Sequence, residues 1–144
     1  MIKLIINLNP MPKQADRSWI NFKMYNKNSK RAGVILHYQP KEITDYVTAV
    51  KKDIRKYKLS MPIDKPIEIC YNFYMERPKS KSEKIIWAKW KPDIENLLKA
   101  INDAIKEYFM TDDSRICIIH AYKKYAEPGT LPRTEIKIKE MEDI

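Results

Sequence analysis

The sequence predicts a small α/β (α+β) fold, in which a mixed β-sheet packs against two main helices. The chain has 144 residues, a length that suits one domain covering residues 1–144. Apolar residues make up 44% of the chain and charged residues 33%, which is the composition of an ordinary globular protein. Two segments carry apolar residues at helical spacing, and several others have the alternation and the Ile, Val, Tyr and Phe content of strands.

The N-terminal part of the chain predicts strands joined by a long loop. Residues 2–8 form an apolar run that indicates a strand, and two prolines close it. Residues 13–38 show no regular period until a short strand is indicated at 34–38. The loop between the two strands carries a basic cluster made of Lys27, Lys30 and Arg31.

A first helix is predicted over residues 41–57, where apolar side chains recur every three to four residues. Pro40 suits the first turn of such a helix. The opposite face is basic, with Lys51, Lys52, Arg55 and Lys56. A basic helix face is more often solvated than in contact with DNA, so we favour the solvated interpretation.

The second half of the chain predicts three strands and the clearest helix. Residues 66–76 are rich in Ile, Tyr and Phe and indicate a strand. Residues 93–109 present one apolar stripe, which predicts a second helix. Another strand is indicated at 115–123, and residues 134–139 alternate strictly, as a final strand with one face in water would.

Composition excludes several classes of function. Only two glycines occur, so the chain has no Gly-rich phosphate loop, and no nucleotide cofactor is expected. Cys70 and Cys117 cannot form a cysteine-based zinc site, and the two histidines share no motif. No segment approaches the ~20 apolar residues of a membrane helix, and the first residues lack a signal-peptide cleavage site, so a cytoplasmic protein with no membrane partner is expected. The formal charge of +9 favours nucleic acid as the partner.

One acidic segment stands out in this basic protein. Residues 93–113 contain six carboxylates and only two lysines. The carboxylates belong to Asp93, Glu95, Asp103, Glu107, Asp112 and Asp113. Carboxylates alone would repel a phosphate backbone, whereas carboxylates that bind Mg²⁺ can promote phosphodiester hydrolysis. The contrast in charge therefore indicates metal-dependent chemistry on nucleic acid.

The spacing of these acids poses a geometric problem. A helix of about 16 residues spans roughly 24 Å, so Asp112 and Asp113 cannot reach Asp93 along the helix itself. The problem is solved if the next strand runs back beside the helix, if the helix is short, bent or begins after the acids, or if a second protomer contributes. Four of the acids also have a purely structural explanation: Asp93 as a helix cap, Glu95 as the ion-pair partner of Lys99, and Asp112 and Asp113 as turn residues.

The order of the residues carries a further signal. Residues 91–99 read Lys-Pro-Asp-Ile-Glu-Asn-Leu-Leu-Lys, followed by Asp-Ala-Ile at 103–105 and Asp-Asp at 112–113. This pattern resembles the signature of the RusA family of Holliday-junction resolvases. The resemblance implies a small homodimeric endonuclease that binds branched DNA, namely four-way junctions, and nicks two opposed strands symmetrically in recombination and repair.

The resemblance also implies roles for individual residues. The metal ligands would be Asp93, Glu95 and Asp113, holding Mg²⁺ with Mn²⁺ as the alternative, and Lys99 would act with them in catalysis. Supporting roles would fall to Asn96, Asp103 and Asp112. The family pattern has Asp where this chain has Glu95, and because Glu also binds divalent cations we expect its function to be retained.

Residues 77–91 form a basic segment that leads directly into Asp93. We predict DNA contacts from Arg77, Lys79, Lys81, Lys84, Lys89 and Lys91, because such side chains bind phosphates without regard to sequence. Trp87 and Trp90 in the same segment either stack on a base or wedge into the junction, or pack in the core or at a dimer interface.

Three other functions stay open on the sequence alone. The first is a non-catalytic module of the same family that binds junctions or other nucleic acids without cutting. The second is a broader nuclease that acts on flaps or forks. The third is a basic interaction protein whose acidic segment is only a solvated helix face.

Overall fold

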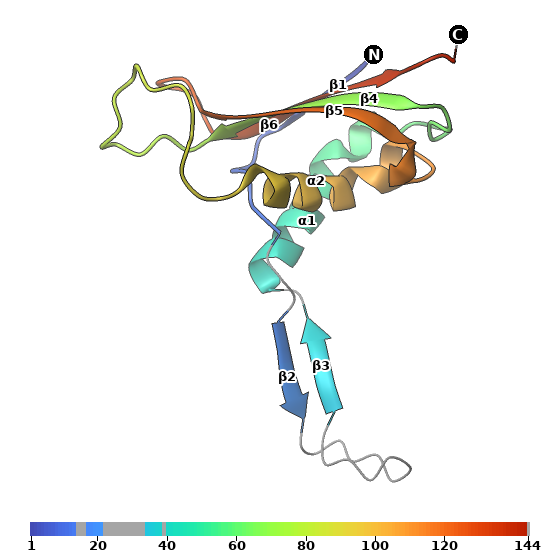
Figure 1. Ribbon diagram of the computed structural model, residues 1–144, viewed down its shortest axis with the longest axis horizontal. Helices are drawn as coiled ribbons and strands as arrows, with labels where there is room; N and C mark the ends of the chain where they lie inside the picture. Colours follow the sequence, from blue (N-terminus) through green and yellow to red (C-terminus); the bar gives the residue numbers. More distant parts are fainter. Residues whose placement is uncertain (14–16, 22–33, 39, 144) are drawn as a thin grey trace.

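In the computed structural model, which describes residues 1–13, 17–21, 34–38 and 40–143, two helices pack against one face of a four-stranded sheet (Figure 1). Side chains are described for residues 1–13 and 40–143. The strands are β1 (Ile2–Ile6), β2 (Arg17–Asn21), β3 (Val34–Tyr38), β4 (Ile67–Met75), β5 (Ile116–Tyr125) and β6 (Arg133–Glu140). The helices are α1 (Lys41–Ile54) and α2 (Ile94–Phe109), with short 3₁₀ turns η1 (Arg55–Tyr57) and η2 (Asp113–Arg115). This arrangement confirms the predicted α+β fold.

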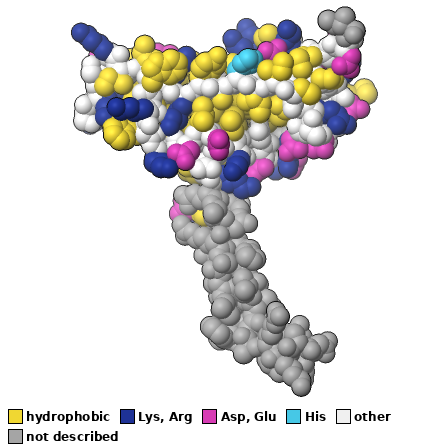
Figure 2. Space-filling view, viewed as in Figure 1, with side chains coloured by type: hydrophobic (Ala, Val, Ile, Leu, Met, Phe, Trp, Pro, Cys, Tyr) yellow, Lys and Arg dark blue, Asp and Glu magenta, His cyan; other side chains and the backbone are white. Residues whose placement is uncertain are grey.

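The main sheet has the strand order β1-β6-β4-β5 and is mixed. β6 pairs antiparallel with both β1 and β4, whereas β4 and β5 are parallel. Parallel neighbours need a long crossover connection, and here the connection contains α2. The strand order places β5 at one edge of the sheet. Figure 2 shows hydrophobic side chains gathered along the sheet.

The central strand β4 shows why the helices cover only one face. Ile67, Ile69, Tyr71 and Phe73 alternate along it and are fully buried against the helices. The residues between them are only partly buried and face away from the helices. The period of two therefore fixes the orientation of β4, as the alternation over residues 66–76 predicts.

A separate two-stranded sheet joins β1 to α1. β2 and β3 pair antiparallel and extend away from the main sheet (Figure 1). The predicted strand at 34–38 is confirmed, but the assignment of residues 17–21 to a loop was wrong, because their strand is defined by pairing with β3 and not by a local pattern. The predicted basic cluster of Lys27, Lys30 and Arg31 lies outside the described residues.

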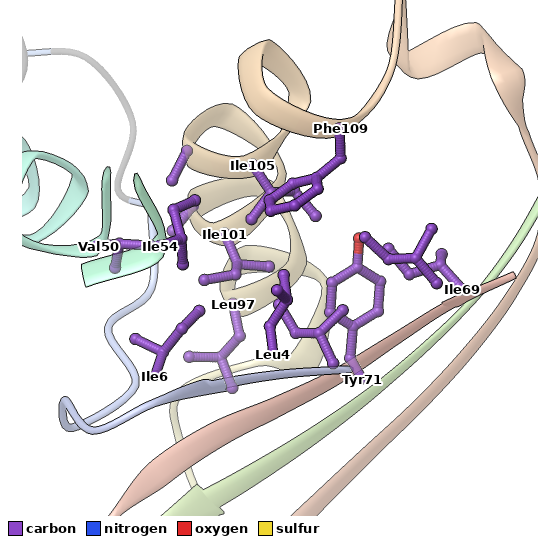
Figure 3. Close-up of a cluster of buried hydrophobic side chains, with 14 of the residues drawn as sticks. Leu4, Ile6, Val50, Ile54, Ile69, Tyr71, Leu97, Ile101, Ile105 and Phe109 are labelled. Atoms are coloured by element: carbon purple, nitrogen blue, oxygen red, sulfur yellow. The ribbon is translucent and has the colours of Figure 1, made fainter. Parts of the chain in front are cut away.

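The two helices bring their apolar stripes together over the sheet. The labelled side chains of the core in Figure 3 are Leu4, Ile6, Val50, Ile54, Ile69, Tyr71, Leu97, Ile101, Ile105 and Phe109. Tyr71 is the polar member, and its hydroxyl donates a hydrogen bond to the amide oxygen of Asn102 on α2. Burial raises the pKa of this hydroxyl. α1 ends at Ile54, and the last three residues of the predicted helix form the 3₁₀ turn η1 instead.

Phe109, which is fully buried at the C-terminal end of α2, should be one of the largest single contributors to stability. Phe109→Ala should lower the free energy of unfolding by about 3–5 kcal/mol, because it removes buried apolar area and leaves a cavity. Urea unfolding followed by circular dichroism measures the change. Leu131→Ala, at a 75% exposed position, is the control and should cost less than about 0.5 kcal/mol. A loss below about 1 kcal/mol for Phe109→Ala would contradict a closed core at this end of α2.

Candidate active site

Asp93 and Glu95 lie at the N-terminus of α2 with their side chains exposed. Asp93 occupies the N-cap position with extended backbone, but its side chain makes no capping hydrogen bond. Its carboxylate instead accepts from the Lys91 ammonium at 3.0 and 3.2 Å, and the Asp93 side chain is 57% exposed. Glu95 follows in the first turn, where the positive end of the helix dipole favours an acid. Neither carboxylate is therefore used as a hydrogen-bonding cap of the helix.

Lys123 holds the segment before α2 against the sheet. Its ammonium, from the C-terminal half of β5, donates to the carbonyls of Pro92 at 2.6 Å and Trp90 at 2.7 Å. Burial lowers the pKa of Lys123, and the nearby charge of Asp93 opposes that shift. Sequence reasoning missed Lys123, because its contact with this segment exists only once β5 returns past the start of α2.

Two of the predicted supporting residues connect α2 to the N-terminal segment. The backbone N–H of Lys13 donates to the carbonyl of Asn96 at 2.9 Å. The Lys13 ammonium forms an ion pair with Asp103 at 2.8 Å. Asn96 also donates its backbone N–H to the carbonyl of Asp93 at 3.1 Å, within the first turn. These contacts fix the chain just before β2 beside the predicted site.

Lys99 and the Glu95 carboxylate share one side of α2, because they are four residues apart on the helix. Lys99 is exposed, as Glu95 is. The start of α2 therefore presents Asp93, Glu95 and Lys99 to solvent, directly after the basic segment 77–91 in the chain.

The other predicted ligand, Asp113, lies beyond the opposite end of α2 in the turn η2. Asp112 accepts a hydrogen bond from the Ser114 hydroxyl at 3.1 Å, and its pKa is lowered by the Asp113 side chain and by Ser114. Asp64, which the sequence did not predict as a site residue, lies beside the same turn. It accepts from the Thr111 hydroxyl and from Arg115, both at 2.8 Å, and these contacts lower its pKa.

The two acidic groups are too far apart to share one cation within a protomer. α2 has 16 residues, so its ends are separated by roughly 24 Å. The helix begins directly after Asp93, and β5 starts on the Asp113 side and returns toward Asp93. In the part of the chain that the structure describes, no group of three or more His, Cys, Asp or Glu side chains could hold a metal ion. A metal site made of Asp93, Glu95 and Asp113 therefore does not fit within a single protomer.

The basic segment 77–91 is anchored by Arg77. Its guanidinium donates to the carbonyls of Ala126 at 3.1 Å, Ser82 at 2.8 Å and Ile85 at 2.7 Å. The same group stacks over the ring of Tyr125 at 5.4 Å. Arg77 thus ties the first half of the segment to the end of β5. Its predicted contact with DNA stays a prediction.

Arg77→Ala should loosen this segment without unfolding the sheet. Amide hydrogen exchange across residues 78–86, followed by mass spectrometry, should become at least about tenfold faster, because several charge-assisted hydrogen bonds are lost. Lys79→Ala, at an exposed position on the same segment, should leave exchange unchanged. Equal exchange in the two variants would show that Arg77 does not hold the segment.

The aromatic side chains of the segment point to solvent. Trp87 is 58% exposed and Trp90 is 60% exposed, so packing in the core of the protomer, one of the two structural explanations, is wrong. The ammonium groups of Lys81 and Lys89 lie 5.5 and 5.2 Å from the Trp90 ring centroid. The ring faces and the cations beside them form a surface that suits stacked bases and phosphates.

The basic segment also carries Lys79, Lys84 and Lys91. Strand β5 adds Lys124 to this surface. Lys124 of β5 lies 5.4 Å from the Trp87 ring centroid and 5.3 Å from the Tyr122 ring centroid.

None of the helices in the described residues is long and apolar enough to cross a membrane.

Comparison with known proteins gives two matches. A family model described as endodeoxyribonuclease RusA matches residues 20–139. The uncharacterized protein YqaN of Bacillus subtilis (strain 168) is 29% identical over 93 residues, which cover 64% of this chain. The match spans 58% of the length of that relative. The family model covers both acidic groups, the basic segment and all of α2.

Proposed function

Because this chain belongs to the RusA endodeoxyribonuclease family, we propose that it resolves Holliday junctions by hydrolysing two opposed strands. The observation that carries the proposal is the position of Asp93 and Glu95. Both carboxylates are exposed at the N-terminus of α2, directly after a basic segment with two exposed tryptophans. A phosphate backbone held by that segment would lie against the two acids.

The proposed enzyme is a homodimer with two composite metal sites. Asp93 and Glu95 of one protomer and Asp113 of its partner would hold Mg²⁺, or Mn²⁺ in its place. A divalent cation bound there supplies charge that offsets the developing charge on the scissile phosphate. The length of α2 supports the division of ligands between protomers, since one protomer cannot bring the three carboxylates together.

Cations of the chain itself would position the DNA. Lys99 lies beside Glu95 on α2 and would contact the scissile phosphate, where its charge is most useful in the transition state. The lysines of segment 77–91 would hold neighbouring phosphates regardless of sequence. A two-fold symmetric dimer would present two such sites to a junction of approximate two-fold symmetry, which is the arrangement that paired nicks in recombination and repair require.

The test uses labelled DNA of three shapes: a four-way junction, a linear duplex of the same sequence and a fork. Each is incubated with the protein in Mg²⁺, in Mn²⁺ and in EDTA. Paired nicks in the junction that disappear in EDTA support the proposal. Equal cutting of the fork would indicate a broader structure-specific nuclease, and junction binding without cutting in either metal would indicate a non-catalytic module, with Glu95→Asp as the first variant to examine.

A further inference from the structure

The main sheet has a second face, which points away from the helices and which we call the outer face. Figure 1 shows both helices on the other side of the sheet, and no helix or strand in the described part of the chain lies over the outer face. The strand pairing and the alternation of side chains give its members. They are Lys3, Ile5, Glu68, Cys70, Asn72, Tyr74, Ile118, His120, Tyr122, Lys124, Arg133, Glu135, Lys137 and Lys139.

The carboxylates of the outer face are already paired with cations. The strands carry five lysine or arginine side chains on this face and only two acids. Glu68 contacts His120 at 3.0 Å and Lys139 at 3.9 Å. Glu135 accepts from Arg133 at 3.4 Å. The charge that stays unpaired on this face is therefore positive, which favours an anionic ligand.

Two of the remaining cations lie directly opposite each other. Lys3 of β1 and Lys137 of β6 are a cross-strand pair, and both side chains are exposed. Like charges in this position repel each other and destabilise the sheet. Neither lysine forms an ion pair among the described residues. A phosphate bound between the two ammonium groups would replace this repulsion with two attractions.

Aromatic rings stand beside the third unpaired cation, Lys124. Trp87 pairs with Lys124 at the edge of the sheet and so continues the outer face beyond β5. The Lys124 ammonium lies between the rings of Trp87 and Tyr122, which are 58% and 41% exposed. Tyr74 is less available, because the Arg133 guanidinium covers its ring at 3.9 Å. Exposed rings on an open sheet backed by two helices are typical of surfaces on which unpaired bases stack.

From these features we propose that the outer face binds a single strand of DNA, with bases stacked on Trp87 and Tyr122 and phosphates held by the three unpaired lysines. Tyr122 and Lys137 are two strands and one two-residue step apart, so their backbones are separated by roughly 12 Å, which a short oligonucleotide can span. The ring faces favour a single strand over a duplex, whose bases are already stacked on each other. The family acts on DNA, so we take DNA as the ligand.

This surface is separate from the candidate active site. Successive side chains of β5 point to opposite faces, so Lys124 lies on the outer face while Lys123 lies on the helix side. Lys123 contacts the segment that leads into Asp93. The proposed strand-binding surface therefore goes beyond the proposed nuclease and does not depend on it.

Fluorescence anisotropy with labelled 12-mers tests the contribution of the rings. All titrations contain EDTA, where metal-dependent cutting does not occur, so the result is independent of junction cleavage. Tyr122→Ala should weaken the binding of oligo-dT at least about fivefold and leave the binding of an abasic 12-mer unchanged, because only oligo-dT has bases to stack. Tyr122→Phe keeps the ring and should bind as the wild type does. Oligo-dT binding by Tyr122→Ala at the wild-type level would overturn the proposal.

A pair of charge reversals tests the contribution of the lysines. Lys137→Glu should weaken the binding of both 12-mers at least about fivefold, because it removes a phosphate contact. Lys52→Glu makes the same change of net charge at an exposed position of α1, in the helix layer, and should change binding less than twofold. Equal losses in the two variants would show that net charge alone attracts the strand, and would refute a site on the outer face.

Photocrosslinking of the wild-type protein locates the strand without any substitution. A 12-mer that carries 5-iodouracil is irradiated in complex with the protein, and mass spectrometry identifies the modified residues. A crosslink to Tyr122 is expected, since this ring belongs to the outer face and not to the segment that leads into α2. Crosslinks confined to α1, or to residues 89–99 at the start of α2, would overturn the proposal.

Discussion

Asp93→Asn should slow junction cleavage by about two to four orders of magnitude, while the affinity for the junction stays the same or rises. The proposed metal ligand is lost, and several kcal/mol of transition-state stabilisation go with it. Binding should not weaken, since the change removes a negative charge from a surface that receives phosphates. The fold should not suffer either, because the Asp93 side chain makes no capping hydrogen bond and is 57% exposed.

The experiment pairs single-turnover cleavage with junction binding in EDTA, where no cutting interferes. Glu107→Gln is a matched control, since Glu107 is an exposed acid on the same helix that pairs with Lys51, away from the proposed site. It should cut at the wild-type rate. Glu95→Gln should behave as Asp93→Asn does. Cleavage by Asp93→Asn within threefold of wild type would remove Asp93 from the site.

A heterodimer of Asp93→Asn and Asp113→Asn protomers should cut DNA, although neither homodimer does. If each site takes Asp93 and Glu95 from one protomer and Asp113 from its partner, both substitutions fall in one site and the other site is intact. Such a heterodimer retains about half of the wild-type number of sites, and its products should be single nicks and not paired ones. If each site were built within one protomer, both sites would carry a substitution and no cutting would occur.

Co-expression of the two variants with different tags, followed by purification on both tags, isolates the heterodimer. The heterodimer of Asp93→Asn with Glu95→Gln is the matched control, because those residues lie in the same half of the site. Each of its two sites would carry one substitution, so it should stay inactive. Cutting by this control, or none by the Asp93→Asn/Asp113→Asn heterodimer, would exclude composite sites.

Local patterns predicted most of the fold. The apolar stripe of residues 93–109 matches α2 to within one residue, and the alternation of residues 66–76 matches β4 closely. Strand β2 was missed because its five residues carry no alternation that distinguishes them from a loop, and it exists through pairing with β3.

The sequence predicts which residues belong to the candidate site, and it predicts only part of their arrangement. The motif and the charge contrast singled out Asp93, Glu95 and Asp113, and the structure places the first two together at one end of α2. Lys123 and Asp64 carried no sequence signal, because their contacts join segments that are distant along the chain.

The sequence by itself determined the family resemblance, the two helices and the identity of the acids, because each depends on residue types at short, fixed spacings. Only the tertiary structure decided that β5 returns past the start of α2, that Arg77 is engaged by carbonyls of its own segment, and that β5 is an edge strand of the sheet. These features depend on which remote segments meet when the core closes. Burial and backbone pairing over the whole chain determine which segments meet, so no local sequence pattern predicts these contacts.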